Sequence, residues 1–477
     1  MVKLILAPNL WSTGEGRTIL AAICAHSIGI SIGLTQGFSA IWLLQLDKSK
    51  EFVINSEQQS WLASLGVITN PVGSILSGIF SQFFGRRISI QLSCIPFTIG
   101  WILLALSRNI YWMYLGRMIT GIAAGMSTAS FTYVGEIATP NTRGLLQSLC
   151  PILTSFGILL VYILGYVLSW KIIAAISIIF TLFTTIAVQL LPESPIHLIK
   201  NHIGTVTQNS KLYQAFEFFN PSGSNVDQKI KESINWNIIN EKGDIENNSF
   251  KAVSLGPETI KPFFLVVGLF LLQELSGIYS ILFYATQFIE ESNIHVNPFI
   301  SSIIVGTIRF SMSIISAPLI QNIGRKTLCT FSGFGMAISL LILGLYIKYY
   351  ELNPNENRTL DWLPLLCITV NVFFSMLGML PIPWILVGEV FPSKVRSVMA
   401  GIVICVAQCF IFISVKIYNN LIDWLGFSGT IFSFVIASVG AMLYSKYILP
   451  ETQGKSLHEI EEYFKNGKSK KTECDNA

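Results

Sequence analysis

Two charged residues stand alone inside long uncharged stretches of this 477-residue sequence. Glu274 is the only charge between Pro262 and Ile289. Arg309 is likewise the only charge from residue 298 to residue 324. Each stretch is long enough to cross a bilayer as a helix, where an isolated charge costs about 2.5 to 3.5 kcal/mol. Because a sequence rarely keeps a charge at that cost without a use for it, both residues are candidates for a functional site.

The two charges have matching predicted depths. Glu274 lies thirteen residues after Lys261, and Arg309 lies sixteen residues before Arg325. At the rise of a helix, these separations place them about 20 and about 24 Å from the same membrane boundary. We therefore predict an ion pair between Glu274 and Arg309 inside a cavity. The alternative is that the pair locks two helices together and faces only protein.

A second pattern pairs acids with arginines at one repeated spacing. Glu136 precedes Arg143 by seven residues, and Glu389 precedes Arg396 by the same distance. The surrounding stretches also match. GRR at 85–87 corresponds to GRK at 324–326, and LPES at 191–194 corresponds to LPET at 449–452. These recurrences predict two related halves, with charged latches that join the halves at one membrane face and break when that face opens. The alternative is that the charges only determine topology. The predicted latch residues are Arg86, Arg87, Glu136, Arg143, Glu193, Arg325, Lys326, Glu389, Arg396 and Glu451.

The composition indicates a membrane protein. Hydrophobic residues make up 52% of the chain and charged residues only 12%, against about 25% charged in soluble domains. Apolar stretches of span length fall into two groups of six with a polar gap between them. The twelve predicted spans are 18–44, 60–84, 88–107, 110–134, 144–168, 171–191, 262–289, 298–322, 327–347, 362–387, 397–417 and 425–447.

The placement of basic residues predicts the orientation. Lysines and arginines gather on one side of the twelve-span arrangement, so this side is cytoplasmic and holds both termini. The glycosylation signal at Asn357 falls on the opposite side. We predict a cell-membrane, multi-pass protein with these parts: cytoplasmic N-terminus 1–17, six-helix half 18–192, cytoplasmic linker helices 193–261, second six-helix half 262–449 and cytoplasmic tail 450–477.

Several longer motifs resemble a known family, the sugar porters of the major facilitator superfamily, and within it the insect facilitated trehalose transporters. They are YLGRMITGIAAGMS, YVGEIATPNTRG, LPESP, QELSGIYSILFYAT, GRKTL, PIPWILVGEVFPSKVRS and PETQGKSLHEIEEYF. The resemblance runs from about residue 20 to residue 464. It implies an all-α membrane protein with the twelve-helix major facilitator fold and a central cavity. It also implies sugar transport by alternating access.

The resemblance also implies a substrate site. In the family the seventh span reads Gln-Gln-Leu-Ser-Gly-Ile-Asn, and its amides bind sugar hydroxyls. Here Gln273 is kept, whereas Glu274 and Tyr279 replace the other two amides. Arg309 stands where the family commonly has an asparagine in the eighth span. The remaining candidates for this site are Ser280, Trp384 beside the Pro381 and Pro383 break, Arg117 and Thr35.

The transport mode has two readings. Proton-coupled relatives oppose the arginine of span 4 with an acid in span 1, but this sequence has Thr35 there. This favours facilitated diffusion of trehalose or a hexose. Glu274 keeps open a proton-coupled sugar symporter, because a buried carboxylate can carry a proton. A sugar receptor that does not transport is a third reading, disfavoured because only 27 residues follow Pro450.

Other function classes find no support in the residues. The sequence has no clustered nucleophile and base, no glycine-rich phosphate loop and no metal-ligand spacing. We therefore expect that the protein is not an enzyme and that it binds no cofactor and no metal. The small net charge of +4 gives no nucleic-acid surface. The expected partners are a sugar and the lipid bilayer, and we expect the protein to act as a monomer. Gly121, Gly125 and Gly401 are predicted to let helices approach closely.

Overall fold

The computed structural model describes residues 14–48, 54–139, 142–200, 210–220, 228, 230, 256–292, 297–356, 360–392, 395–454 and 457–466. Within these ranges the secondary structure is helical, and they contain no strand. The all-α class that the family resemblance implies is therefore confirmed for the described residues.

The helices group into two compact units. The first unit comprises residues 1–246, 281–317 and 415–419, and the second comprises 247–280, 318–414 and 420–477. Three helices contribute residues to both units: α17 (Ile278–Phe283), α19 (Pro298–Asn322) and α23 (Arg396–Tyr447). The division into halves at 18–192 and 262–449 stays a prediction.

The first unit contains the N-terminal helices, several of which begin at side-chain caps. Asn55 caps α4 through a capping box with Gln58, and Asn109 caps α7. The helices are α2 (Gly14–His26), α3 (Ile28–Lys48), α4 (Ser56–Ile68), α5 (Asn70–Phe83), α6 (Arg86–Ala105), α7 (Ile110–Met126), α8 (Ala129–Ile137), α9 (Arg143–Gln147), α10 (Leu149–Val167), α11 (Trp170–Gln189), α12 (Pro195–Lys200), α13 (Lys211–Phe219) and α18 (Ala285–Glu291).

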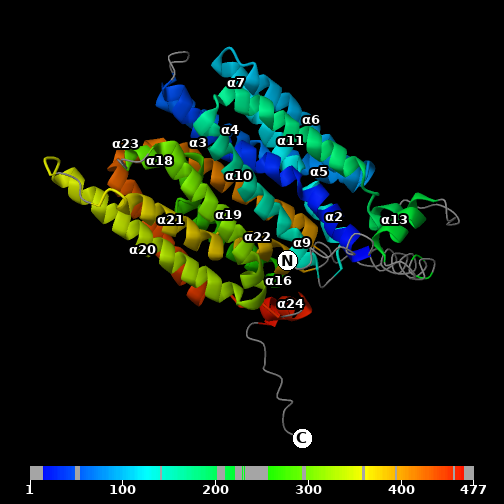
Figure 1. Cartoon of the computed structure of the whole chain (residues 1–477). Helices are drawn as coiled ribbons and strands as arrows, with labels where there is room; N and C mark the ends of the chain where they lie inside the picture. Colours follow the sequence, from blue (N-terminus) through cyan, green and yellow to red (C-terminus); the bar gives the residue numbers. More distant parts are fainter. Residues whose placement is uncertain are drawn as a thin grey trace, which may run out of the picture. The chain divides into compact units, whose positions relative to one another are not determined.

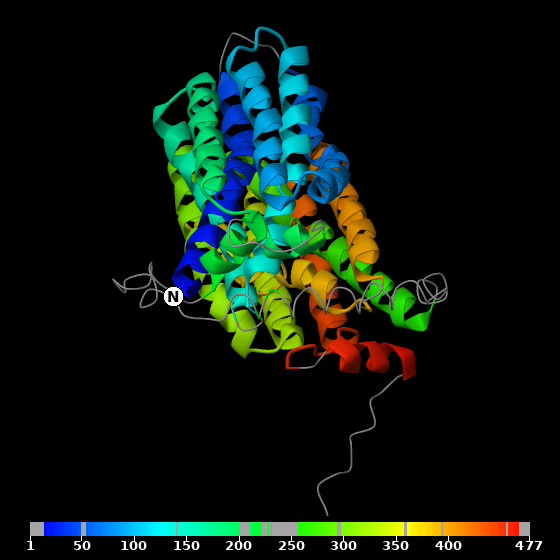
Figure 2. The ribbon, with the colours of Figure 1, turned by 90° about the vertical axis from the view of Figure 1, so that its right-hand side faces the viewer.

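Close helix contacts hold the first unit together. Helix α3 packs along α10, and α7 packs on both α4 and α5, as the blue to cyan helices show in Figure 1 and in the turned view of Figure 2. A Cβ atom on Gly121 would lie 2.2 Å from the Gly66 carbonyl oxygen, and one on Gly125 would lie 2.0 Å from that of Asn70. Close helix approach at these two glycines is confirmed. A Cβ on Gly401 would meet nothing within 4 Å, so close approach there during the transport motion stays a prediction.

The second unit contains the C-terminal helices. Its largest element, α23, is two helices joined at a kink, because Gly426 has a φ of 74° inside it. The other helices are α16 (Pro257–Leu275), α20 (Arg325–Leu352), α21 (Leu363–Leu377), α22 (Ile382–Glu389) and α24 (Leu457–Asn466). Helix α20 packs on α21, and α16 packs on both α22 and α24.

The helix lengths fit twelve membrane crossings. Among the described residues, nine continuous helices are long and apolar enough to span a bilayer. One of them, Val398–Tyr447, has 50 residues and the Gly426 kink, so it can cross twice. The predicted spans 110–134 and 262–289 are broken into shorter helices, α7 with α8 and α16 with α17 and α18.

Helical backbone is interrupted at two places in the second unit. Helix α16 ends at Leu275, and Gly277 follows with a φ of 78° before α17 begins. Helix α21 ends at Leu377, and α22 begins after Pro381. Ser332 of α20 satisfies two backbone groups beside the second break, since its hydroxyl accepts the Met379 N–H and donates to the Phe374 carbonyl. The break predicted at Pro381 and Pro383 is confirmed.

Candidate functional site

The last turn of α16 carries two buried polar side chains whose polar atoms form no hydrogen bond with other described residues. Gln273 is 0% exposed and Glu274 is 2% exposed. Neither the amide atoms of Gln273 nor the carboxylate oxygens of Glu274 have a hydrogen-bond partner among the described residues. Because an unsatisfied buried polar group is costly, four such atoms on neighbouring residues indicate a place where a ligand completes the bonding.

The backbone around these residues is fixed by the second unit itself. The hydroxyl of Ser276 donates to the Gln273 carbonyl, and the hydroxyl of Ser414 donates to the Glu274 carbonyl at 3.1 Å. The Ser280 hydroxyl lies 3.0 Å from that of Ser414. These bonds explain how a broken helix holds its end. They also give Ser280 a role in supporting the site.

Aromatic side chains lie on the same unit. Trp384, directly after the proline break, packs edge-on against Phe270 of α16 with ring centroids 5.0 Å apart. This contact links the two broken helices α16 and α22. Tyr279 is buried as well. The Trp384 indole is half-buried, so it offers an aromatic face to a molecule with C–H groups to stack.

Sequence reasoning missed Asn371 of α21. Its side chain is 2% exposed, and its Nδ2 has no hydrogen-bond partner among the described residues. It is the only amide side chain in α21. A lone amide in an apolar span is the signal that could have identified it, by the same argument that singled out Glu274.

The predicted ion pair between Glu274 and Arg309 stays a prediction, because the two residues belong to different units. Both carboxylate oxygens of Glu274 lack a hydrogen-bond partner in the part of the chain that the structure describes. Arg309 is buried and belongs to the first unit, whereas Glu274 belongs to the second. The depth estimate gave the height of each residue along its helix but not the direction in which each side chain points.

Arg117 joins three helices of the first unit. Its Nε donates to the Leu62 carbonyl and its Nη1 to the Thr35 carbonyl, at 3.0 and 2.9 Å. Its Nη2 donates to the Ser39 hydroxyl at 2.7 Å. The side chain is 1% exposed. These bonds connect α7 to α3 and α4, so the geometry favours a structural role for Arg117 over contact with substrate.

A charged network lies at one end of the first unit. Arg86 Nη2 lies 2.8 Å from Glu136 Oε1, and Arg86 Nη1 also donates to the Ser81 carbonyl. The Ser194 hydroxyl donates to the other oxygen of Glu136. Glu193 accepts the backbone N–H groups of Arg86 and Arg87 at the start of α6. This carboxylate thus satisfies N–H groups at the first turn of that helix and interacts favourably with the positive end of its dipole.

The second unit repeats this network almost atom for atom. Arg325 Nη2 lies 2.8 Å from Glu389 Oε1, and its Nη1 donates to the Ile320 carbonyl. The Thr452 hydroxyl donates to the other oxygen of Glu389. Glu451 accepts the N–H groups of Arg325 and Lys326 at the start of α20. The paired motifs in the sequence therefore correspond to one structural device, present once in each unit.

The remaining predicted latch residues have different outcomes. Arg87 donates through Nη1 to the Leu191 carbonyl, and Arg143 is exposed at the start of α9. The side chain of Arg396 and the signal at Asn357 lie outside the described residues. Because both ion pairs connect elements of the same unit, a latch that joins the two halves stays a prediction.

The described residues offer no obvious metal centre. No group of three or more histidine, cysteine, aspartate or glutamate side chains gathers among them. The unpartnered atoms of Gln273, Glu274 and Asn371 are uncharged amides and one carboxyl. Each amide suits a hydroxyl group better than a cation, which prefers several oxygen ligands.

Comparison with known protein families and sequences gives a consistent result. The family model described as "Sugar (and other) transporter" matches residues 21–464. A facilitated trehalose transporter of Bombyx mori is 30% identical over 447 residues, which cover 93% of this chain and 86% of that protein. A facilitated trehalose transporter of Polypedilum vanderplanki is 27% identical over 446 residues, covering 93% of this chain and 87% of the relative.

Solved structures show the same fold. A proton:xylose symporter of the major facilitator superfamily, bound to 6-bromo-6-deoxy-D-glucose, aligns with a TM-score of 0.73 at 20% identity. The alignment covers 94% of this chain and all of that one. An inward-open xylose transporter from E. coli aligns at 0.72 and 22% identity, covering 93% and 98% of the two chains. The predicted major facilitator fold is therefore confirmed, and the helix lengths are consistent with twelve spans.

Proposed function

Because this chain belongs to the family of sugar (and other) transporters, we propose that it carries a sugar across the cell membrane by alternating access and facilitated diffusion. The observation that carries this proposal is the pair of buried, unpartnered side chains Gln273 and Glu274 at the broken end of α16. Their position in a multi-pass membrane protein provides hydrogen-bonding groups where the bilayer offers none.

Trehalose or a hexose is the proposed cargo. The relatives in Bombyx mori and Polypedilum vanderplanki are facilitated trehalose transporters. Gln273 and Asn371 supply amides for sugar hydroxyls, and Trp384 supplies an aromatic face. The protein acts as a monomer, with both termini in the cytoplasm. The clusters of arginine and lysine at 85–87 and 324–326 support this orientation.

Uptake in oocytes tests the function. Cells that express the full chain receive labelled trehalose, glucose and a polyol, and counterflow is measured with each sugar. We expect saturable counterflow of at least one sugar, and Gln273→Ala should raise its KM about tenfold through the loss of a hydrogen bond. Glu462→Gln, an exposed change on α24, serves as the matched control. Absence of counterflow for every sugar, with the protein present at the surface, would refute the proposal.

Proton coupling is the second candidate, and one observation favours it. Glu274 has two buried carboxylate oxygens without a partner among the described residues, and ionisable side chains inside membrane spans are typical of proton pathways in transporters. A coupled carrier would accumulate sugar against its gradient and lose this accumulation when the pH gradient is removed. In that case Glu274→Gln should leave counterflow intact while abolishing accumulation. Counterflow that is independent of pH in wild type would rule this candidate out.

A further inference from the structure

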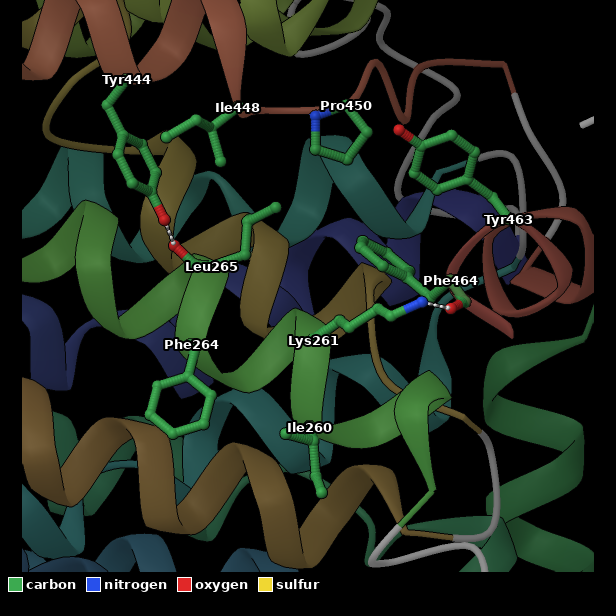
Figure 3. A pocket seen from close by; sticks show the side chains of 9 residues that line it. All are labelled: Ile260, Lys261, Phe264, Leu265, Tyr444, Ile448, Pro450, Tyr463 and Phe464. Atoms are coloured by element: carbon green, nitrogen blue, oxygen red, sulfur yellow. Dashed lines mark hydrogen bonds between the residues drawn. The ribbon is translucent and has the colours of Figure 1, made fainter. Parts of the chain in front are cut away.

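A pocket outside the proposed sugar site lies between three helices of the second unit. It has a volume of about 530 Å³ and is lined by residues of α16, α23, α24 and the segment that joins the last two. Figure 3 shows its walls. The lining residues are Ile260, Lys261, Phe264, Leu265, Tyr444, Ile448, Pro450, Tyr463 and Phe464.

The pocket is apolar apart from one cation. Its side chains are mostly aliphatic or aromatic, and Lys261 is the only charged residue among them. Lys261 Nζ donates to the Phe464 carbonyl at 3.0 Å, in the last turn of α24. The Tyr444 hydroxyl is already engaged with the Leu265 carbonyl. An ammonium group has three donors, so Lys261 keeps capacity for an anion.

The rim of the pocket exposes large apolar side chains. Phe264 is 66% exposed and Ile448 is 54% exposed. Phe264 lies in the N-terminal half of α16, and Ile448 is the residue that directly follows α23. Exposed apolar surface beside a cation, at the end of a membrane span, matches a molecule with a hydrocarbon chain and an anionic head.

The end of α24 and the sequence that follows it are also suited to an anionic partner. Residues 465–471 hold Lys465, Lys468, Lys470 and Lys471, with no acid among them. Four lysines close to a membrane span favour an anionic lipid surface. The tail itself is a poor occupant for the pocket, because its lysines would repel Lys261.

We propose that this pocket binds an anionic phospholipid of the cytoplasmic leaflet, with the phosphate at Lys261 and an acyl chain along Phe264 and Ile448. The site goes beyond sugar transport. Because Lys261 also bonds the end of α24, one ammonium group holds both the phosphate and the Phe464 carbonyl. The lipid therefore affects how firmly α24 is held against α16.

Native mass spectrometry of the full chain tests the site. The protein is reconstituted in nanodiscs of phosphatidylcholine with rising fractions of phosphatidylserine, and the bound phosphatidylserine is counted after release. We expect Lys261→Gln to weaken binding about fivefold, which corresponds to about 1 kcal/mol. Lys446→Gln removes an exposed lysine of α23 outside the pocket and should change it little. Equal losses in both variants would overturn the site.

Two further arms separate the alternatives. Phe264→Ser removes the apolar wall at an exposed position, so it should fold and should also lose retained phosphatidylserine. If it binds as wild type does, the acyl-chain contact is wrong. Inorganic phosphate should neither compete with the lipid nor raise the thermal midpoint. If phosphate alone does both, the pocket is a free-anion site and the lipid proposal fails.

Discussion

Arg86 and His197 lie in direct contact, with 2.7 Å between Arg86 Nη1 and His197 Nδ1. A guanidinium has donors only, so Nδ1 must accept, and the imidazole is neutral in this contact. The acids of this network are Glu136 and Glu193, and the other cation is Arg87. The imidazole thus gives the Arg86 guanidinium an acceptor in addition to Glu136 and the Ser81 carbonyl.

We expect His197 to stabilise the protein as an acceptor for Arg86. His197→Gln keeps a side-chain oxygen that can accept and should lower the thermal midpoint in detergent little. His197→Lys places a permanent cation against Arg86 and should cost about 1 to 3 kcal/mol at neutral pH. The prediction fails if the two variants lose the same stability.

Glu193 and Glu451 should each stabilise the unit that contains them. Each accepts two backbone N–H groups at a helix start, and Glu→Gln removes the charge that strengthens these bonds. We expect each change to lower the free energy of unfolding by about 1 to 3 kcal/mol, measured as thermal stability, and Glu462→Gln to lower it little.

The double variant of Glu193 and Glu451 tests the predicted latch between the halves. The two networks lie in separate units, so independent networks should give losses that add within about 0.5 kcal/mol. A coupling energy well above this would show that the networks act on each other. It would then support a latch that spans both halves.

Arg117 should be required for stability rather than for sugar affinity. Its guanidinium bonds α3 and α4 at three or more acceptors, which a lysine cannot reach together. Arg117→Lys should destabilise the protein by about 2 to 3 kcal/mol while the KM of the remaining protein stays near that of wild type. Thr35→Val is the control, because the Thr35 hydroxyl bonds only to the Ser31 carbonyl of its own helix. A large rise in KM with unchanged stability would restore the substrate role.

The repeated networks show how far the sequence predicts this structure. The motifs GRR, GRK, LPES and LPET identify the participating residues because a duplicated loop keeps its charged side chains. They do not reveal the partners. Seven-residue spacing places Glu136 near Arg143 along the chain, yet Glu136 pairs with Arg86, which reaches it only through the packing of α6 against α8.

The candidate site was predictable where one residue type is decisive. An uncharged span with a single glutamate or a double proline identifies Glu274 and the break before Trp384. Pairing was not predictable, since rise along a helix fixes height and leaves rotation about the axis open. His197 also escaped prediction, because the matching position after Glu451 is Lys455 and the repeat gives no sign of a histidine contact.

Gly277→Ala should damage the broken helix in two separable ways. Gly277 has a φ of 78°, which costs a residue with a Cβ about 1 to 2 kcal/mol. The new Cβ would also lie 2.5 Å from the Phe434 ring. We expect a loss of stability and of transport, measured by thermal midpoint and by uptake. Gly388→Ala is the matched control, since its Cβ meets nothing within 4 Å.

Adding Phe434→Ala to Gly277→Ala separates the two costs. Removal of the ring relieves the steric contact but leaves the backbone strain, so the double variant should recover part of the stability that Gly277→Ala loses, relative to Phe434→Ala alone. Full recovery of stability would mean that the positive φ of residue 277 carries no cost. No recovery would mean that backbone strain alone accounts for the loss. Transport should follow stability in either case, because this turn directly follows the end of α16 that carries Gln273 and Glu274.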